Sequence, residues 1–151
     1  MMNDQFESVY QEYKNYVFRL ALSYTKNIKD SEDILQNVFL KYYRNNSKIP
    51  KEKTKSWLTK VTINDCKTYW LYFWKRGTVE LDENQLSDGN ESSNFLESIS
   101  CLKPKDSLII HLYYYEGYKI KEISKILKMK ESTVKSRLKR TKEKIKDLLE
   151  E

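Results

Sequence analysis

The stretch from Tyr118 to Leu149 constrains the fold of this 151-residue chain more than any other. Its apolar residues recur at spacings of three and four in two runs: Ile120, Ile123 and Leu127, then Val134, Leu138, Ile145 and Leu149. This period predicts two amphipathic helices. The residues from Leu127 to Lys130 break the first run, and Ser132-Thr133 supplies polar residues suited to a helix start. A short helix, a tight turn and a longer basic helix predict a helix-turn-helix.

The second of these helices carries hydroxyl and cationic side chains away from its apolar stripe. They are Ser132, Thr133, Lys135, Ser136, Arg137, Lys139 and Arg140. Such groups near a helix N-terminus suit the phosphates and base edges of a DNA major groove. The alternative interpretation is a solvated amphipathic helix whose lysines only keep it soluble. Because the preceding helix and turn are also present, we favour DNA binding.

Composition excludes several other classes. Only 3 Gly and 2 Pro argue against a β-rich fold with many tight turns and for a mostly helical one. No apolar run approaches the length of a membrane span, and the N-terminus lacks the regions of a signal peptide. Cys66 and Cys101 show no metal-ligand spacing, so we expect two buried thiols in a reduced, cytoplasmic protein. The single histidine, His111, lies in an apolar run and is expected to pack in a core. With no nucleophile–base pair or phosphate loop in the sequence, we expect no catalytic residue, no metal and no cofactor.

The net charge of +6 is distributed unevenly. Residues 51–76 carry 7 Lys and Arg against 2 Asp and Glu, and residues 101–151 carry 14 against 8. Residues 77–100, between these basic blocks, carry 6 acidic residues and no basic one. This arrangement predicts two contacts with nucleic acid joined by an acidic connector. The stretch from Gly77 to Asn94 has little apolar content and is typical of an exposed, disordered linker.

Three further helices are predicted in the first half of the chain. Apolar and tyrosyl residues at helical spacing predict the first from Gln5 to Lys26. The second opens at Asp30, with Asp33 three residues on as a capping-box-like pair, and ends at Asn45. The third runs from Thr54 to Arg76.

The helix that opens at Asp30 has a polar, acidic face. It is formed by Asp30, Glu32, Asp33, Gln36 and Asn37, beside Phe39 and Leu40. This face is either an ordinary first turn whose acidic residues favour the helix dipole, or a docking surface for a basic or amphipathic partner helix. The residues by themselves support both interpretations equally.

The helix from Thr54 to Arg76 is unusually aromatic. Trp57, Leu58 and Val61, with Cys66, are its expected core positions, and Asn64, Lys67, Tyr69, Trp70, Tyr72, Phe73 and Trp74 follow. One helix of a small domain cannot bury so much aromatic surface. Each of these aromatic residues alone is better explained as a core or protein-contact residue. Because the cluster adjoins a basic block, we favour contact with unstacked bases of a single strand.

These motifs together resemble a known family. DSEDILQNVFLKYY (Asp30–Tyr43) resembles the core-binding helix of bacterial sigma factors of the extracytoplasmic-function type, where D-A-E-D-[LI]-x-Q-[DE]-x-F is typical. SWLTKVTINDCKTYW (Ser56–Trp70) resembles the adjoining helix that melts and reads the −10 promoter element. LKPKDSLIIHLYYYEGYKIKEISKIL with ESTVKSRLKRTKEKIK resembles region 4, the reader of the −35 element. The resemblance covers nearly the whole chain, in the order that the family has.

The resemblance implies an all-α fold of two small helical domains. Residues 1–76 would form sigma region 2, residues 77–98 a flexible acidic linker, and residues 99–151 the region 4 helix-turn-helix. The expected function is that of a sigma factor, which directs core RNA polymerase to specific promoters and performs no chemistry itself. The expected partners are the clamp helices of the polymerase β′ subunit, the β flap and promoter DNA. Many relatives are held inactive by an anti-sigma factor, and the same regulation is a hypothesis for this chain.

The resemblance also assigns residues to three surfaces. Core polymerase would contact Asp30, Glu32, Asp33, Gln36 and Phe39. The separated −10 strand would lie near Asn64, Lys67, Tyr69 and Trp70. The −35 duplex would contact Ser132, Thr133, Lys135, Ser136, Arg137 and Arg140.

This chain departs from the family pattern at Thr68, where an aspartate is usual, and at Leu71 to Trp74, which stands where a run of arginines usually follows. Two alternative functions remain open from the sequence. An autonomous helix-turn-helix regulator would bind duplex DNA by itself as a dimer. A sigma-like module would bind polymerase without selecting promoters.

Overall fold

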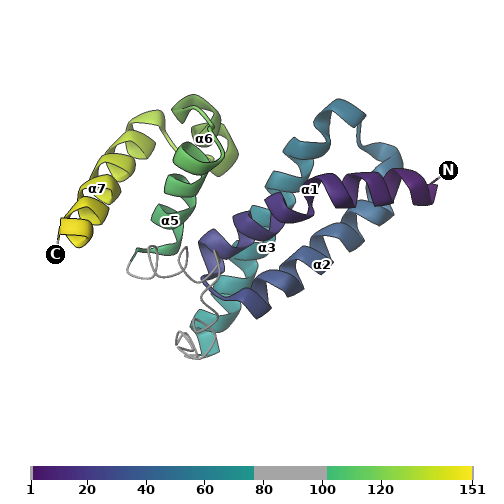
Figure 1. Cartoon of the computed structure of the whole chain (residues 1–151), viewed down its shortest axis with the longest axis horizontal. Helices are drawn as coiled ribbons and strands as arrows, with labels where there is room; N and C mark the ends of the chain where they lie inside the picture. Colours follow the sequence, from purple (N-terminus) through teal and green to yellow (C-terminus); the bar gives the residue numbers. More distant parts are fainter. Residues whose placement is uncertain (1, 77–101, 151) are drawn as a thin grey trace. The chain divides into compact units, whose positions relative to one another are not determined.

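The structure, a computed structural model, describes residues 2–76 and 102–150, and every regular element in these two ranges is helical. The chain divides into two compact units, Met1–Gln85 and Leu86–Glu151 (Figure 1). The predicted all-α, two-domain fold is therefore confirmed. The predicted linker at 77–98 and Cys101 lie outside the described residues. In the described part of the chain, no helix combines the length and apolarity needed to cross a bilayer.

The first unit is a bundle of three long helices, α1 (Met2–Thr25), α2 (Ile28–Asn45) and α3 (Thr54–Arg76). Each helix packs against the other two, and two single 3₁₀ turns, η1 (Asn46–Lys48) and η2 (Lys51–Lys53), connect α2 to α3. The apolar stripes predicted from the sequence meet at the centre. The core contains Val17, Leu20, Ala21, Ile34, Val38, Phe39, Tyr42, Leu58, Ile63 and Cys66, all buried. Both predicted ends of α3 are confirmed, whereas Trp57 and Val61 are only partly buried.

The start of α2 differs from the prediction. Helix α2 begins at Ile28, and its cap is Asn27, whose side-chain oxygen accepts a 2.9 Å hydrogen bond from the main-chain N–H of Asp30. Asp30 is therefore inside the first turn and does not cap the helix. The cause lies one residue earlier, where Lys26 adopts a left-handed backbone conformation with φ of 58° and reverses the chain. Lysine rarely adopts this conformation, so the sequence did not signal the position of the turn.

The second unit contains α5 (Pro104–Ile110), a π-helical turn η4 (His111–Tyr115), α6 (Ile120–Leu127) and α7 (Glu131–Glu150). Helix α7 packs against both α5 and α6. The buried residues include Leu108, Ile109, Leu112, Ile123, Leu127, Val134 and Leu138. Of these, Ile123, Leu127, Val134 and Leu138 are positions at which the sequence predicted an apolar stripe. His111 is buried as predicted, with its Nε2 atom 3.4 Å from Oε1 of Glu116.

The turn between α6 and α7 completes the predicted helix-turn-helix. Lys128 takes a left-handed conformation, with φ of 56°, just after α6 ends. The carbonyl of Lys130 accepts a 3.1 Å hydrogen bond from the N–H of Val134, so α7 begins at Glu131. Ser132 and Thr133 consequently lie in the first turn of α7, with both side chains exposed. The expectation that they mark the helix start is therefore off by one residue.

Candidate functional site

The polar face predicted on α2 is partly confirmed by its exposure. Glu32, Asp33 and Gln36 are exposed, whereas Asp30 is only partly so. Phe39 does not belong to this surface, because its side chain is 3% exposed. It packs edge-to-face on Tyr10, with ring centroids 5.0 Å apart. The prediction that Phe39 contacts a partner directly is therefore corrected, since the core of the first unit needs this ring.

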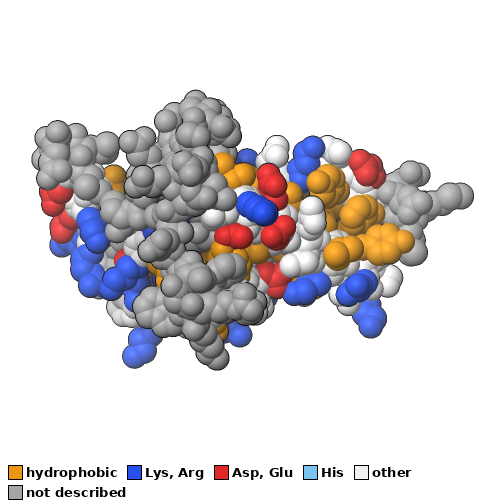
Figure 2. Space-filling view, turned by 90° about the horizontal axis from the view of Figure 1, so that it is seen from below, with side chains coloured by type: hydrophobic (Ala, Val, Ile, Leu, Met, Phe, Trp, Pro, Cys, Tyr) orange, Lys and Arg blue, Asp and Glu red, His pale blue; other side chains and the backbone are white. Residues whose placement is uncertain are grey.

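Leu40 takes the exposed position that the sequence assigned to Phe39. Its side chain is 53% exposed, on the same side of α2 as Gln36, four residues earlier. Tyr43 is also an exposed large side chain. Figure 2 shows hydrophobic side chains beside acidic and basic ones on one face of the first unit. Helical spacing from Asp33 and Gln36 was the signal that could have selected Leu40.

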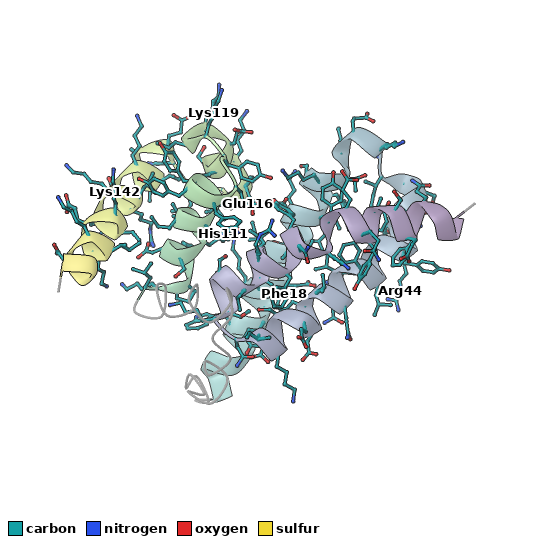
Figure 3. All side chains as sticks on the ribbon, in the orientation of Figure 1. Phe18, Arg44, His111, Glu116, Lys119 and Lys142 are labelled. Atoms are coloured by element: carbon teal, nitrogen blue, oxygen red, sulfur yellow. The ribbon has the colours of Figure 1, made fainter. Side chains whose placement is uncertain are left out.

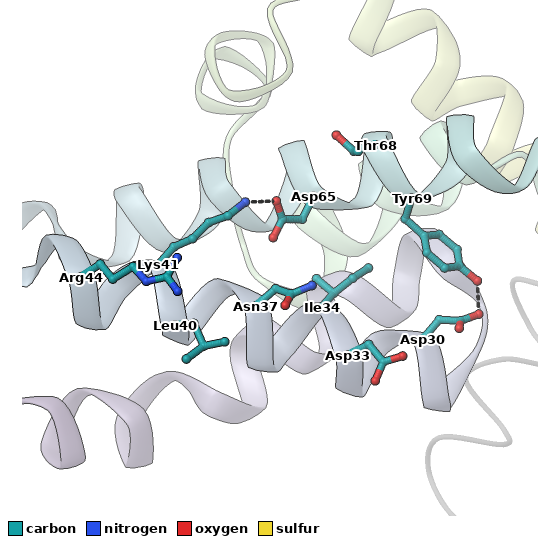
Figure 4. Close-up of a pocket in the computed structure, with 10 residues that line it drawn as sticks. All are labelled: Asp30, Asp33, Ile34, Asn37, Leu40, Lys41, Arg44, Asp65, Thr68 and Tyr69. Carbon is teal, nitrogen blue, oxygen red and sulfur yellow. Dashed lines mark hydrogen bonds and ion pairs between the residues drawn. The ribbon is translucent and has the colours of Figure 1, made fainter.

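A groove lies between α2 and α3 (Figure 4), with a volume of about 590 Å³. It is lined by Asp30, Asp33, Ile34, Asn37, Leu40, Lys41, Arg44, Asp65, Thr68 and Tyr69. Two side-chain contacts join its walls. The Nζ atom of Lys41 forms an ion pair with Oδ1 of Asp65 at 2.6 Å, and the hydroxyl of Tyr69 donates to Oδ2 of Asp30. The two helices are thus tied together at two points along the groove.

Asp30 is more buried than Glu32 and Asp33, the other acidic residues of α2. Burial raises the pKa of its carboxyl group above the usual range, and the nearby charge of Asp33 raises it further, against an opposing effect of Lys29. Its carboxylate accepts from Tyr69, which was assigned to a different predicted surface. The structure therefore joins a residue predicted to bind polymerase to one predicted to bind DNA.

The four residues predicted for the −10 strand do not share one face of α3. Asn64 faces solvent, and Lys67 lies partly exposed beside it. Tyr69 turns toward α2, whereas Trp70 turns toward α1 and packs edge-to-face on Tyr24 at 6.4 Å. The solvent face of α3 is instead formed by Lys60, Asn64, Thr68 and Leu71, all exposed. The side chains of residues 72–76, which include the rest of the aromatic cluster, lie outside the described ones.

A smaller hollow of about 240 Å³ lies where α2, the two 3₁₀ turns and α3 meet. It is lined by Asn45, Lys48, Ile49, Pro50, Lys53, Ser56, Trp57 and Lys60. The three lysines are exposed, and the Trp57 ring is half-buried against Tyr42 at 6.0 Å. An aromatic ring edged by cations suits a nucleotide, which offers a π-face and a negative charge. None of the four residues predicted for the −10 strand lines this hollow, although a lysine-rich stretch just before Trp57 precedes it in the sequence.

On α7, most of the predicted −35 residues share one exposed surface. Ser132, Thr133, Lys135, Ser136 and Arg140 are all exposed, whereas Val134 and Leu138 are buried. Arg137 differs, because its Nη1 atom forms a 2.9 Å ion pair with Oδ1 of Asp106 in α5. Lys142 extends outward further along the same helix (Figure 3). The exposed cations lie on the side of α7 that the unit's own core does not use.

Two family models match the chain. Sigma-70 region 2 matches residues 9–76, and sigma-70 region 4 matches residues 92–145. These ranges contain the three-helix bundle from Val9 onward and the helix-turn-helix.

Two relatives align with most of the chain. The chain is 29% identical over 152 residues to the ECF RNA polymerase sigma factor SigM of Bacillus subtilis, covering 94% of this chain and 93% of that protein. It is 28% identical to the RNA polymerase sigma factor SigV of the same organism, with 84% and 80% covered.

Solved structures show the same fold. The sigma factor RpoE of Bartonella quintana, determined in complex with the anti-sigma factor NepR, aligns with a TM-score of 0.74 at 20% identity, covering 97% of each chain. CnrH, determined with the cytosolic domain of CnrY, aligns with a TM-score of 0.72 at 16% identity, covering 98% of this chain and 89% of that one. With both sigma-70 regions matched in order, this chain is an RNA polymerase sigma factor of the extracytoplasmic-function group.

Proposed function

We propose that the exposed face of α2, formed by Glu32, Asp33, Gln36 and Leu40, binds the clamp helices of the polymerase β′ subunit. This proposal rests on the exposure of an apolar side chain, Leu40, within an acidic and amide surface. Interfaces of this kind combine an apolar centre with a polar rim. The acidic residues would attract a basic partner and speed its association, while burial of Leu40 would supply affinity.

The separated −10 strand, in the same proposal, follows the solvent face of α3 and enters the lysine-edged hollow at Trp57. Asn64 and Lys60 lie on that face, and Lys60 also lines the hollow. The two sites are therefore continuous. A base leaving the duplex loses its stacking, at a cost of a few kcal/mol, and contact with an aromatic ring and lysines would offset this cost.

The −35 duplex is proposed to contact the N-terminal half of α7. Ser132 and Thr133 in its first turn can bond phosphate oxygens, and Lys135 and Arg140 can neutralise them. The helix-turn-helix places such a second helix in the major groove. Binding by this unit should therefore weaken as salt rises.

The chain is proposed to act in the cytoplasm without performing chemistry itself. Core polymerase would catalyse RNA synthesis, and this subunit would supply promoter choice. An anti-sigma partner is a further part of the proposal. It is supported by two proteins of the same fold, one determined with the anti-sigma factor NepR and the other with the cytosolic domain of CnrY.

The test is multi-round transcription with sigma-free bacterial core polymerase and a genomic library that includes the chain's own upstream region. We expect transcripts from sites that share −35 and −10 sequences, which should be absent without this protein. Sequence-specific binding of duplex DNA by the protein alone, without transcripts, would favour an autonomous regulator. Polymerase binding without promoter choice would favour the other alternative, a sigma-like module that does not select promoters.

Two variants sharpen the test of DNA contact. Replacing Arg140 with alanine should weaken promoter binding and lower the salt slope by about one. Lys146, an exposed cation near the other end of α7, is the matched control and should change both quantities less.

A further inference from the structure

We propose that Asp30 is a positioning residue for the −10 strand: its carboxylate fixes Tyr69 in the groove between α2 and α3. This inference rests on the proposed function and changes the role of one residue in it. The family resemblance assigns Asp30 to polymerase docking. The contacts of its side chain favour DNA reading.

Both the main chain and the side chain of Asp30 form hydrogen bonds. Its main-chain N–H donates to Oδ1 of Asn27 at 2.9 Å, and its carboxylate accepts from the Tyr69 hydroxyl. Asn27 is in turn held by Thr25, whose Oγ1 atom accepts from the Asn27 N–H at 3.2 Å. These hydrogen bonds hold Asp30 in place at the end of the groove. One of its carboxylate oxygens already accepts a hydrogen bond from the same chain.

The neighbouring acidic residues, Glu32 and Asp33, are better placed to bind polymerase. Glu32 and Asp33 are exposed, while the Asp30 side chain is partly buried against α3. A partner that bound the Asp30 carboxylate would have to displace Tyr69 and forgo the bond between them. Burial also raises the pKa of this carboxyl group, as expected for a side chain directed into the molecule.

Tyr69 gains a fixed ring position from this bond. The ring lines the groove on the side of α3 that faces Asp30, and the preceding residue, Thr68, belongs to the solvent face of α3 on which we place the −10 strand (Figure 4). A tyrosine anchored through its hydroxyl has lost its rotamer freedom before a base arrives. Its contact with an unstacked base would then cost less ordering, which favours binding.

The experiment uses holoenzyme assembled from core polymerase and the full chain. The probe is fork-junction DNA that carries the single-stranded −10 element of a promoter recovered in the transcription test. Affinity for core polymerase is measured separately by titrating a fluorescently labelled chain. Tyr69→Phe deletes only the hydroxyl, Asp30→Ala deletes the acceptor, and Asp30→Asn retains an oxygen that can accept.

Tyr69→Phe and Asp30→Ala should each weaken fork-junction binding by about threefold to tenfold, the range expected for one hydrogen bond. The variant that combines Tyr69→Phe with Asp30→Ala should bind fork-junction DNA no more weakly than either single variant, because each substitution removes the same hydrogen bond. Asp30→Asn should restore most of the loss. Core affinity should stay within about twofold of the wild type for all of them.

Lys41→Gln is the matched control, since it breaks the other tie between α2 and α3. It should leave fork-junction affinity nearly unchanged. An equal loss in Lys41→Gln would reduce Asp30 to a general role in helix packing. Loss of core affinity in Asp30→Ala, with Tyr69→Phe unaffected, would return Asp30 to polymerase docking. Wild-type holoenzyme that binds no fork junction would overturn the proposed function itself, and the inference with it.

Discussion

Arg137 of α7 and Asp106 of α5 form a 2.9 Å ion pair inside the second unit, with both side chains only partly exposed. Arg137 was assigned to the −35 duplex, together with Arg140. The structure separates the two arginines, because Arg140 is exposed on the outer surface of α7. Arg137 thus joins α7 to α5, and we expect the two arginines to respond differently to substitution.

A double-mutant cycle over Arg137 and Asp106 should detect their coupling. Arg137→Ala and Asp106→Ala should each lower the free energy of unfolding, and their coupling energy should be about 0.5–1 kcal/mol, as for partly exposed pairs. Urea denaturation of the four proteins measures it. Arg140→Ala is the control and should leave stability within about 0.5 kcal/mol of the wild type. Additive losses at Arg137 and Asp106 would contradict the pairing.

Phe39 and Leu40 are adjacent in sequence but should give opposite results. Phe39→Ala should cost about 3–5 kcal/mol of stability, because it empties a buried ring position. Leu40→Ala should leave stability nearly unchanged and lower the affinity for core polymerase by about tenfold, because only the 53% of this side chain that is exposed can be newly buried, and a fully buried leucine is worth about 1.5–3 kcal/mol. Thermal denaturation and titration of core polymerase measure the two effects.

Leu40→Met is the matched control for the docking surface, since it retains an apolar side chain of similar volume. It should keep most of the affinity. If Leu40→Ala binds core polymerase as tightly as the wild type, the exposed leucine lies outside the interface.

The helices could be predicted from the sequence, but several functional side chains could not. Periodicity identified Thr54 to Arg76 as one helix with both ends correct, because apolar spacing records which face is buried. The directions of Tyr69 and Trp70 depend on where α1 and α2 lie, and no local pattern contains that information. The pairing of Arg137 with Asp106 joins residues far apart in the chain. Such contacts are set by tertiary packing, so helical spacing and the family resemblance both assigned the two arginines to DNA.

Replacing Lys128 with glycine should stabilise the protein. Its left-handed conformation, with φ of 56°, costs a residue with a side chain about 1–2 kcal/mol, and glycine avoids most of this cost. Glycine also loses more conformational freedom than lysine on folding, which offsets part of this gain. We therefore expect Lys128→Gly to raise the free energy of unfolding by about 0.5–1 kcal/mol. Urea denaturation measures the change.

Lys125→Gly is the control for this prediction, because Lys125 is an exposed residue inside α6. The same substitution should there destabilise by about 1 kcal/mol. A loss of stability at both positions would show that the left-handed turn carries little strain in this protein.

Cys66 should make the first unit sensitive to alkaline pH. Its thiol is buried, and burial raises its pKa well above the ordinary value of 9.0, with the charge of Asp65 acting in the same direction. The folded chain therefore keeps this proton above pH 9, whereas the unfolded chain releases it. Stability should be unaffected at neutral pH and fall above about pH 9, by at most about 1.4 kcal/mol per pH unit for this one group.

The measurement is the free energy of unfolding from pH 7 to pH 10 for the wild type and Cys66→Ala. The variant should start lower, because it loses a buried side chain, but decline less steeply. Tyr24 and Tyr42, whose pKa values burial also raises, remain in both proteins and set the residual slope. Alkylation gives an independent check in a Cys101→Ser background, where Cys66 should react only as fast as the first unit opens, since the reactive species is the thiolate. Parallel pH profiles, or rapid alkylation under native conditions, would show that the thiol is accessible and that its burial does not control its ionisation.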